Sequence, residues 1–123
     1  MKLLYENHIM NDGSVIDSSS LSALQEAMGE DFSGLVPIFI ESTGDILTNL
    51  LNAFNQQDIE SFTREAHSLK SSSANLGGLI LSEMAAKLEK AGHQGQLPES
   101  EEFIKPLKET FVLMEKELQQ HQL

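Results

Sequence analysis

The chain has 123 residues, 40% hydrophobic and 22% charged, so it can form the core of one domain but not of two ordinary ones. Nineteen acidic residues against eight basic ones give a net charge of −11, which argues against nucleic acid and anionic membrane surfaces as partners, since both require a basic face. No apolar run approaches the roughly 20 residues of a membrane span, the first residues do not resemble a secretory signal, and cysteine is absent. We therefore expect a cytoplasmic protein whose partner is another protein.

The first 16 residues are weakly patterned. Residues 11–13, Asn-Asp-Gly, are typical of a turn, so an arm, a small hairpin and a flexible, disordered segment all remain open for residues 1–16. Asp17 and the serines at 18–20 offer N-cap oxygens for a short first helix that ends near Gly29. We take residues 17–121 as a single domain.

A second helix is predicted from about Asp31 to Phe54. Its predicted core stripe, supported by Phe39 and Leu47, consists of Leu35, Ile38, Ser42, Ile46, Leu50 and Ala53. Pro37 lies in its second turn and is expected to bend the helix or delay its start. Residues 55–57 form a short turn, so the next helix must pack antiparallel to this one.

Asp58 caps a third predicted helix, which ends at the Gly77-Gly78 pair. Its stripe has the spacing 3, 4, 3, 4, 3 and consists of Ile59, Phe62, Ala66, Leu69, Ser73 and Leu76. A fourth helix covers about residues 79–91 and stops at Gly92. The side chains it is expected to bury are Leu81, Met84, Ala85 and Leu88.

Residues 93–97 form a loop, and Pro98 or the acidic residues after it open a last helix that runs to about Gln120. Its predicted stripe is Ile104, Leu107, Phe111, Met114 and Leu118. Pro106 removes a backbone hydrogen-bond donor and is expected to kink this helix. Four long amphipathic helices with short connections predict an all-α fold, an antiparallel up-down-up-down four-helix bundle with the short first helix at one end.

One face of the third helix carries the candidate site. At roughly 100° per residue, His67 falls outside the buried stripe, on the solvent side. Its neighbours on that face are Thr63, Lys70, Ser71 and Ala74, three of which are small. This face therefore offers an imidazole that another protein can approach closely.

An exposed neutral imidazole is a nucleophile at physiological pH. A phosphoryl group on its outer nitrogen would be stabilised by the ammonium of Lys70, one turn away. An acceptor on the neighbouring helix would hold the proton on the other ring nitrogen, and Glu89 is the candidate for that role.

Other chemistries do not fit the spacing. No His-x-x-x-His or His-Glu pair supports zinc, and the acidic residues lack the order of a calcium-binding EF-hand, so we expect no metal site. Ser68 follows His67 directly and points about 100° away on a helix, which excludes a Ser-His dyad. The run from Ser71 to Gly78 lacks the Gly-Lys-Ser/Thr ending of a phosphate-binding loop.

Residues 67–77, HSLKSSSANLG, resemble the signature of histidine-containing phosphotransfer (HPt) domains of phosphorelays. That signature is roughly His-x-Leu-Lys-Gly, two or three small residues, an apolar residue and Gly. Residues 15–17, VID, with Leu21 and Leu24, resemble the first helix of the family, and residues 88–92, LEKAG, resemble the end of its next-to-last helix. The resemblance covers about residues 15–118.

The resemblance implies a four-helix bundle whose exposed His67 accepts a phosphoryl group from a receiver-domain aspartate and passes it to another. The implied partners are receiver domains of response regulators and of hybrid histidine kinases. Those receivers would supply the magnesium ion, and this chain, an expected monomer that is not an enzyme, would carry no cofactor. Lys70 matches the phosphate-neighbouring lysine of the family, and Glu89 a polar residue that hydrogen-bonds the active histidine. The receiver docking face would then include Thr63, Ser71, Ala74 and Gly77, the last matching the second glycine of the signature.

Two positions depart from the pattern. Ser71 stands where the family usually has Gly, and because it adds only a hydroxymethyl group we expect docking to be kept, with altered preference among receivers. His93 stands where some members carry a basic residue, and we interpret it, like His8 and His121, as an ordinary surface residue. The alternative functions are a docking module that binds and regulates a receiver or histidine kinase without taking phosphate, and a bundle with a purely structural role.

Overall fold

The computed structural model describes residues 14–120. The long helices are α3 (Phe32–Asn55), α4 (Ile59–Asn75), α5 (Leu79–His93) and α6 (Ile104–Gln120). A shorter helix, α2 (Ser18–Met28), precedes them, and two 3-10 turns, η1 (Gly29–Asp31) and η2 (Glu101–Phe103), lead into α3 and α6. The described residues contain no strand, which confirms the all-α class. The predicted turn at residues 11–13 lies outside the described residues.

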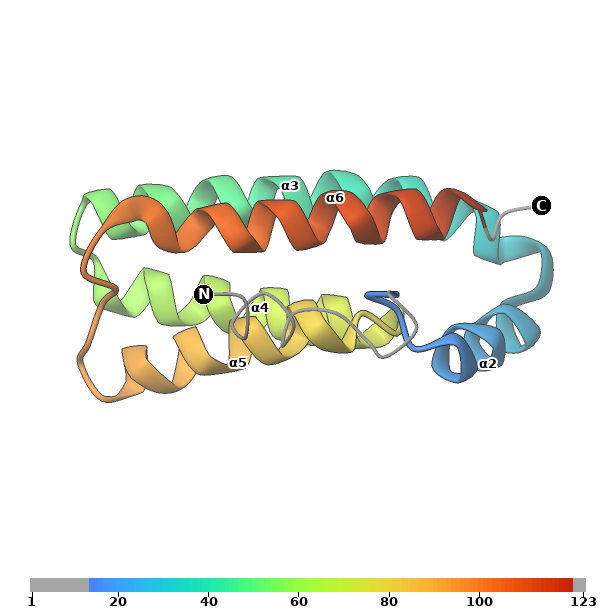
Figure 1. The fold of residues 1–123 in the computed structure, drawn as a ribbon, viewed down its shortest axis with the longest axis horizontal. Coiled ribbons are helices and arrows are strands. Elements are labelled where there is room, and N and C mark those ends of the chain that lie inside the picture. The colour runs from blue at the N-terminus through green and yellow to red at the C-terminus, as the bar shows by residue number, and fades with distance from the viewer. Residues whose placement is uncertain (1–13, 121–123) are drawn as a thin grey trace.

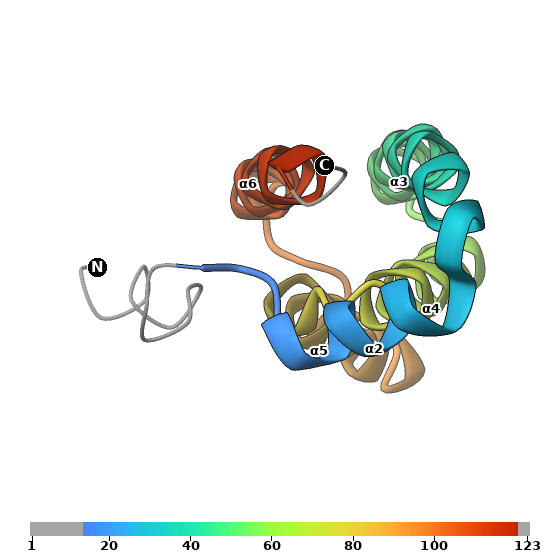
Figure 2. The same ribbon diagram turned by 90° about the vertical axis from the view of Figure 1, so that its right-hand side faces the viewer.

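The four long helices form two layers. α3 and α6 lie side by side in one layer, and α4 and α5 lie in the other (Figure 1). Seen from the end, the four helices occupy the corners of a bundle, and α2 lies across the end of the α4–α5 layer (Figure 2). Along the chain each long helix runs opposite to the one before it (Figure 1), with short turns at residues 56–58 and 76–78. α4 and α5 are therefore neighbours along most of their length.

The buried stripe of α3 differs from the predicted one. The residues that α3 buries are Phe32, Val36, Phe39, Thr43, Leu47, Leu50 and Ala53. Leu50 and Ala53 of the predicted stripe are buried, but Ile38 is 64% exposed and Ser42 is exposed, so the prediction is wrong at those two positions. Two apolar stripes about 100° apart run along this helix, and the tertiary partner selects between them. Here Phe39 turns inward and packs edge-on against Phe111 of α6, with ring centroids 6.4 Å apart.

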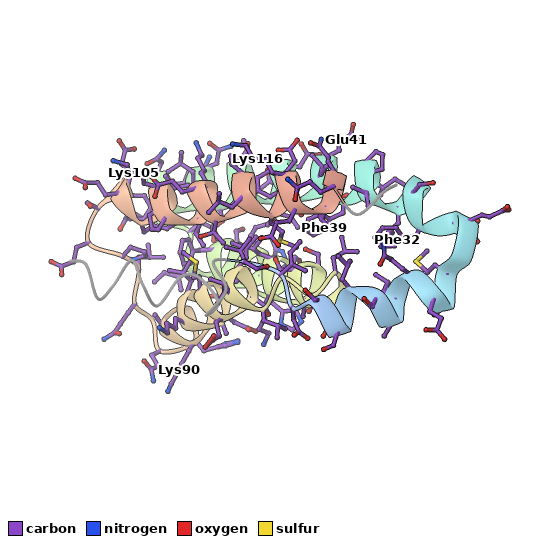
Figure 3. The ribbon with its side chains drawn as sticks, turned by 45° about the vertical axis from the view of Figure 1, so that its right-hand side comes forward. Phe32, Phe39, Glu41, Lys90, Lys105 and Lys116 are labelled. Carbon is purple, nitrogen blue, oxygen red and sulfur yellow. The ribbon has the colours of Figure 1, made fainter. Side chains whose placement is uncertain are left out.

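Figure 3 shows the same inside-outside division in side chains. Phe32 and Phe39 point between the layers, whereas Lys90, Lys105 and Lys116 point outward. Within the described part of the chain, no helix is long and apolar enough to cross a membrane.

The two internal prolines act differently from the prediction. α3 begins at Phe32, before Pro37, so the proline does not delay the start of that helix. α6 begins at Ile104 rather than near residue 98, and this places Pro106 in its first turn. The N–H groups of a first turn have no partner within the helix, so the premise of a mid-helix proline that kinks α6 is wrong.

The chain before α2 belongs to the folded core. Val15 and Ile16 are buried, and the backbone N–H of Val15 donates to Glu117 Oε1 of α6 at 2.6 Å. The N–H of Asp17 donates to the carbonyl of Gly77 at 2.7 Å. The predicted boundary, which assigned residues 1–16 to an arm outside the domain, is therefore wrong for residues 15 and 16.

Candidate functional site

The buried stripe of α4 decides where His67 points. The carboxylate of Asp58 caps the helix by accepting from the backbone N–H of Ser61 at 3.1 Å. The residues that α4 buries are Phe62, Ala66, Leu69 and Ser73. This stripe turns the opposite face to solvent, and the side chain of His67 is 59% exposed in the middle of the helix.

Glu89 of α5 is the centre of the site. Its Oε2 lies 2.8 Å from His67 Nδ1, and its Oε1 lies 2.6 Å from the ammonium of Lys70. The Glu89 side chain is only 12% exposed, because α4 and α5 pack closely around it. The structure thus brings together the predicted acceptor His67, the predicted phosphate-stabilising Lys70 and the predicted imidazole partner Glu89.

The pKa of the Glu89 carboxyl is lowered from 4.5 to about 2. The hydrogen bond from Lys70 is the largest cause, and the hydrogen bond from His67 adds to it, while partial burial opposes both. Glu89 is therefore a carboxylate at neutral pH, and a carboxylate only accepts hydrogen bonds. Its contact with His67 consequently assigns the proton to Nδ1.

In the neutral ring, a proton on Nδ1 leaves Nε2 of His67 with its lone pair. Within residues 14–120, this nitrogen makes no hydrogen bond, and the side chain that carries it is 59% exposed. A neutral imidazole oriented in this way can attack an electrophile brought by a partner.

His93 also reaches the site, which the sequence analysis missed. Its Nε2 lies 3.5 Å from Oε2 of Glu89, the oxygen that accepts from His67. This separation exceeds a normal hydrogen bond, so the contact is electrostatic and acts when His93 is protonated. The signal that could have revealed it is the i,i+4 spacing of the two residues on α5.

The predicted docking residues divide into two groups. Ser71 and Ala74 are exposed beside His67, and Thr63 is half-buried one turn before it. Gly77 is buried, with φ of +78°. A Cβ at Gly77 would lie 3.0 Å from the Asp17 carbonyl oxygen. Its assignment to the docking face is therefore wrong: Gly77 makes the turn after α4 and seats the chain before α2.

No group of three or more acidic, histidine or cysteine side chains among residues 14–120 is placed to hold a metal ion. The described site accordingly consists of one imidazole, one carboxylate and one ammonium, with His93 at its edge.

Comparisons with known proteins agree with this geometry. The family model of the Hpt domain matches residues 34–122, a range that contains His67, Lys70 and Glu89. The chain therefore belongs to the Hpt domain family, whose members carry phosphoryl groups in phosphorelays and interact with receiver domains.

The fold is also similar to that of a solved phosphotransfer protein. The crystal structure of histidine-containing phosphotransfer protein B (HptB) from Pseudomonas aeruginosa PAO1 matches with a TM-score of 0.82 and 25% sequence identity. The match covers 86% of this chain and 92% of that one. Comparison with curated proteins gave no match.

Proposed function

We propose that this protein is a phosphorelay intermediate in which His67 accepts a phosphoryl group from a receiver-domain aspartate and passes it to the aspartate of another receiver. The observation that carries the proposal is the exposed His67 ring, whose Nδ1 is held by the ionised Glu89 while Nε2 is left unpartnered by the described residues.

The transfer needs no reactant other than the phosphorylated receiver and this protein. The lone pair of Nε2 attacks the phosphorus of the aspartyl phosphate, the P–N bond forms, and the bond from phosphorus to the aspartate oxygen breaks to release a carboxylate. The proton stays on Nδ1, so the phosphorylated ring is a cation. Glu89 lies 2.8 Å from Nδ1 and stabilises that positive charge. The onward transfer reverses these bond changes with a second receiver.

Lys70 has two tasks in this proposal. Its ammonium holds Glu89 in place through the 2.6 Å contact, and it lies one helical turn from His67, where it reduces the negative charge of a bound phosphoryl group. The receiver supplies the magnesium ion and most of the stabilisation of the transition state. This chain then acts as a carrier, needs no cofactor of its own, and is not an enzyme.

We infer that the receiver docks on the exposed surface around His67. That surface includes Thr63, Ser71 and Ala74 of α4, together with small exposed side chains of α2. Small side chains allow the aspartyl phosphate to come within bonding distance of Nε2. Receivers of response regulators and of hybrid kinases are the expected partners, each held in a transient complex with a monomer of this protein.

Transfer of radiolabel from a phosphorylated receiver tests the proposal. Wild type should become labelled, His67→Gln should not, and His93→Gln, a matched change on the neighbouring helix, should label like wild type. Wild type that binds receivers but takes no label from any receiver of the source organism would contradict the relay and favour the docking module. Wild type that neither binds nor takes label would favour a structural role.

A further inference from the structure

α4 and α5 approach each other most closely where α5 carries a glycine. Gly92 is buried in the last turn of α5 and faces Thr63 of α4. A Cβ added to Gly92 would overlap Thr63 Oγ1, and it would lie 3.1 Å from Thr63 Cβ and 3.4 Å from Thr63 Cα. The backbone of α5 therefore occupies space that any other residue would need for its side chain.

Thr63 has little freedom to give way. Its hydroxyl donates to the carbonyl of Ile59 at 2.8 Å, and rotating it away would break this hydrogen bond. Such a rotation would also leave the 3.1 Å contact to Thr63 Cβ, which is shorter than the roughly 3.5–4.0 Å of a relaxed carbon–carbon contact. Relief consequently requires a wider separation between the two helices.

This close contact lies beside the group formed by His67, Lys70 and Glu89. Glu89 precedes Gly92 by one helical turn, and its carboxylate must reach across to α4 to meet both Nδ1 of His67 and Nζ of Lys70. A hydrogen bond joins the same two helices on the other side of Glu89, where Ser82 Oγ donates to the carbonyl of Lys70 at 2.9 Å. The distance from α5 to α4 is thus set on both sides of Glu89.

We propose that Gly92 is a positioning residue, whose missing side chain lets α5 approach α4 closely enough for Glu89 to hold the His67 ring. The effect of Gly92 on phosphoryl transfer rests on the proposed function. The effect of Gly92 on the His67 ring can be measured on this protein alone, without any receiver.

Gly92→Ala is the direct test, read by NMR on the full chain. The ¹⁵N shifts of His67 should show a smaller fraction of the tautomer with its proton on Nδ1. The pKa of Glu89 should rise from about 2 toward its ordinary 4.5, because its contacts with Lys70 and His67 lengthen. Phosphoryl acceptance should slow by roughly threefold to tenfold, the effect of losing one exposed hydrogen bond.

Gly44→Ala is the matched control. Gly44 also lies inside a long helix, α3, but a Cβ there would meet nothing within 4 Å. The control should leave the His67 tautomer and the Glu89 pKa unchanged, whereas a general effect of removing a helical glycine would shift both variants alike and overturn the proposal.

The double variant Gly92→Ala/Thr63→Gly moves the missing Cβ from α5 to α4. It should restore the His67 tautomer and the low Glu89 pKa, which a merely structural role of Gly92 would not predict. A folded Gly92→Ala with wild-type tautomer and wild-type Glu89 pKa would overturn the proposal. If Gly92→Ala does not fold, a folded double variant that fails to restore both values overturns it as well. If wild type accepts no label, the proposed function is refuted. The NMR results still decide whether Gly92 positions Glu89 against the His67 ring.

Discussion

Removing the ammonium of Lys70 should raise the pKa of Glu89, lower the stability of the fold and shorten the lifetime of the phosphohistidine. Lys70 Nζ lies 2.6 Å from Glu89 Oε1, and its hydrogen bond is the largest cause of the lowered Glu89 pKa. In Lys70→Ala the contact with His67 remains, so the pKa of Glu89 should rise part of the way from about 2 to 4.5.

The size of the effect follows from the pKa and from exposure. A Glu89 pKa lowered from 4.5 to about 2 corresponds to about 3 kcal/mol if it were wholly expressed in the free energy of unfolding. The Lys70 side chain is 36% exposed, so water screens the interaction. We therefore expect Lys70→Ala to lower the free energy of unfolding by about 1 kcal/mol at neutral pH.

The stability difference between wild type and Lys70→Ala should depend on pH, in a direction that the lowered pKa of Glu89 sets. A carboxyl whose pKa is lowered by folding stabilises the folded state above its unfolded pKa, and this stabilisation is lost as the pH falls through the folded value. The difference between wild type and Lys70→Ala should thus be constant above about pH 4.5 and shrink as the pH falls toward 2. The measurements are urea unfolding across this range and a ¹³C titration of the Glu89 carboxyl.

Lys87→Ala, which removes an exposed lysine of the same neighbourhood on α5, is the control and should leave the Glu89 pKa in place. The phosphohistidine of Lys70→Ala should decay several-fold faster than that of wild type, because an ammonium beside phosphoryl oxygens at an exposed site contributes at most about 1 kcal/mol, or roughly fivefold. A Glu89 pKa that stays at about 2, or a stability difference that does not depend on pH, would refute the assignment of Lys70 as the main partner of Glu89.

Three further changes probe the surroundings of His67 and the turn after α4. His93→Ala should leave phosphoryl acceptance within about twofold of wild type, because a 3.5 Å contact at an exposed ring contributes little, and loss of labelling in this variant alone would reassign the acceptor. Gly77→Ala should lower the free energy of unfolding by about 1–2 kcal/mol in urea, since φ is +78° there, whereas Gly44→Ala should leave it equal or raise it by about 0.5–1 kcal/mol. Ser71→Trp should slow transfer strongly with an unchanged circular dichroism spectrum, and transfer at the wild-type rate would show that the receiver docks elsewhere.

The helices and the exposed histidine could be predicted because both depend on local spacing. The period of α4 places Phe62, Ala66 and Leu69 on one side, so His67 has to lie outside that stripe whatever the helix packs against. The cap at Asp58 and the turn at Gly77 are likewise properties of a few neighbouring residues.

The core of α3, by contrast, depends on more than local spacing. Residues 35, 38, 42 and 46 and residues 36, 39, 43 and 47 form two apolar stripes on the same helix, and each has an acceptable helical period. The structure buries the second, because Phe39 packs against Phe111 of α6, its neighbour in the same layer. The choice depends on a residue more than 70 positions away along the chain.

The candidate site likewise has one part that local spacing determines and one part that helix packing determines. The sequence by itself determined that His67 and Lys70 lie one turn apart on an exposed helical face, since helix geometry sets that distance. Glu89 was expected near His67, but the tertiary structure alone decided that it also meets Lys70, that His93 shares its oxygen, and that Gly92 leaves the room for this approach. Helical periodicity specifies direction around one axis, whereas the separation between two axes is set by the side chains in contact, which come from distant parts of the chain.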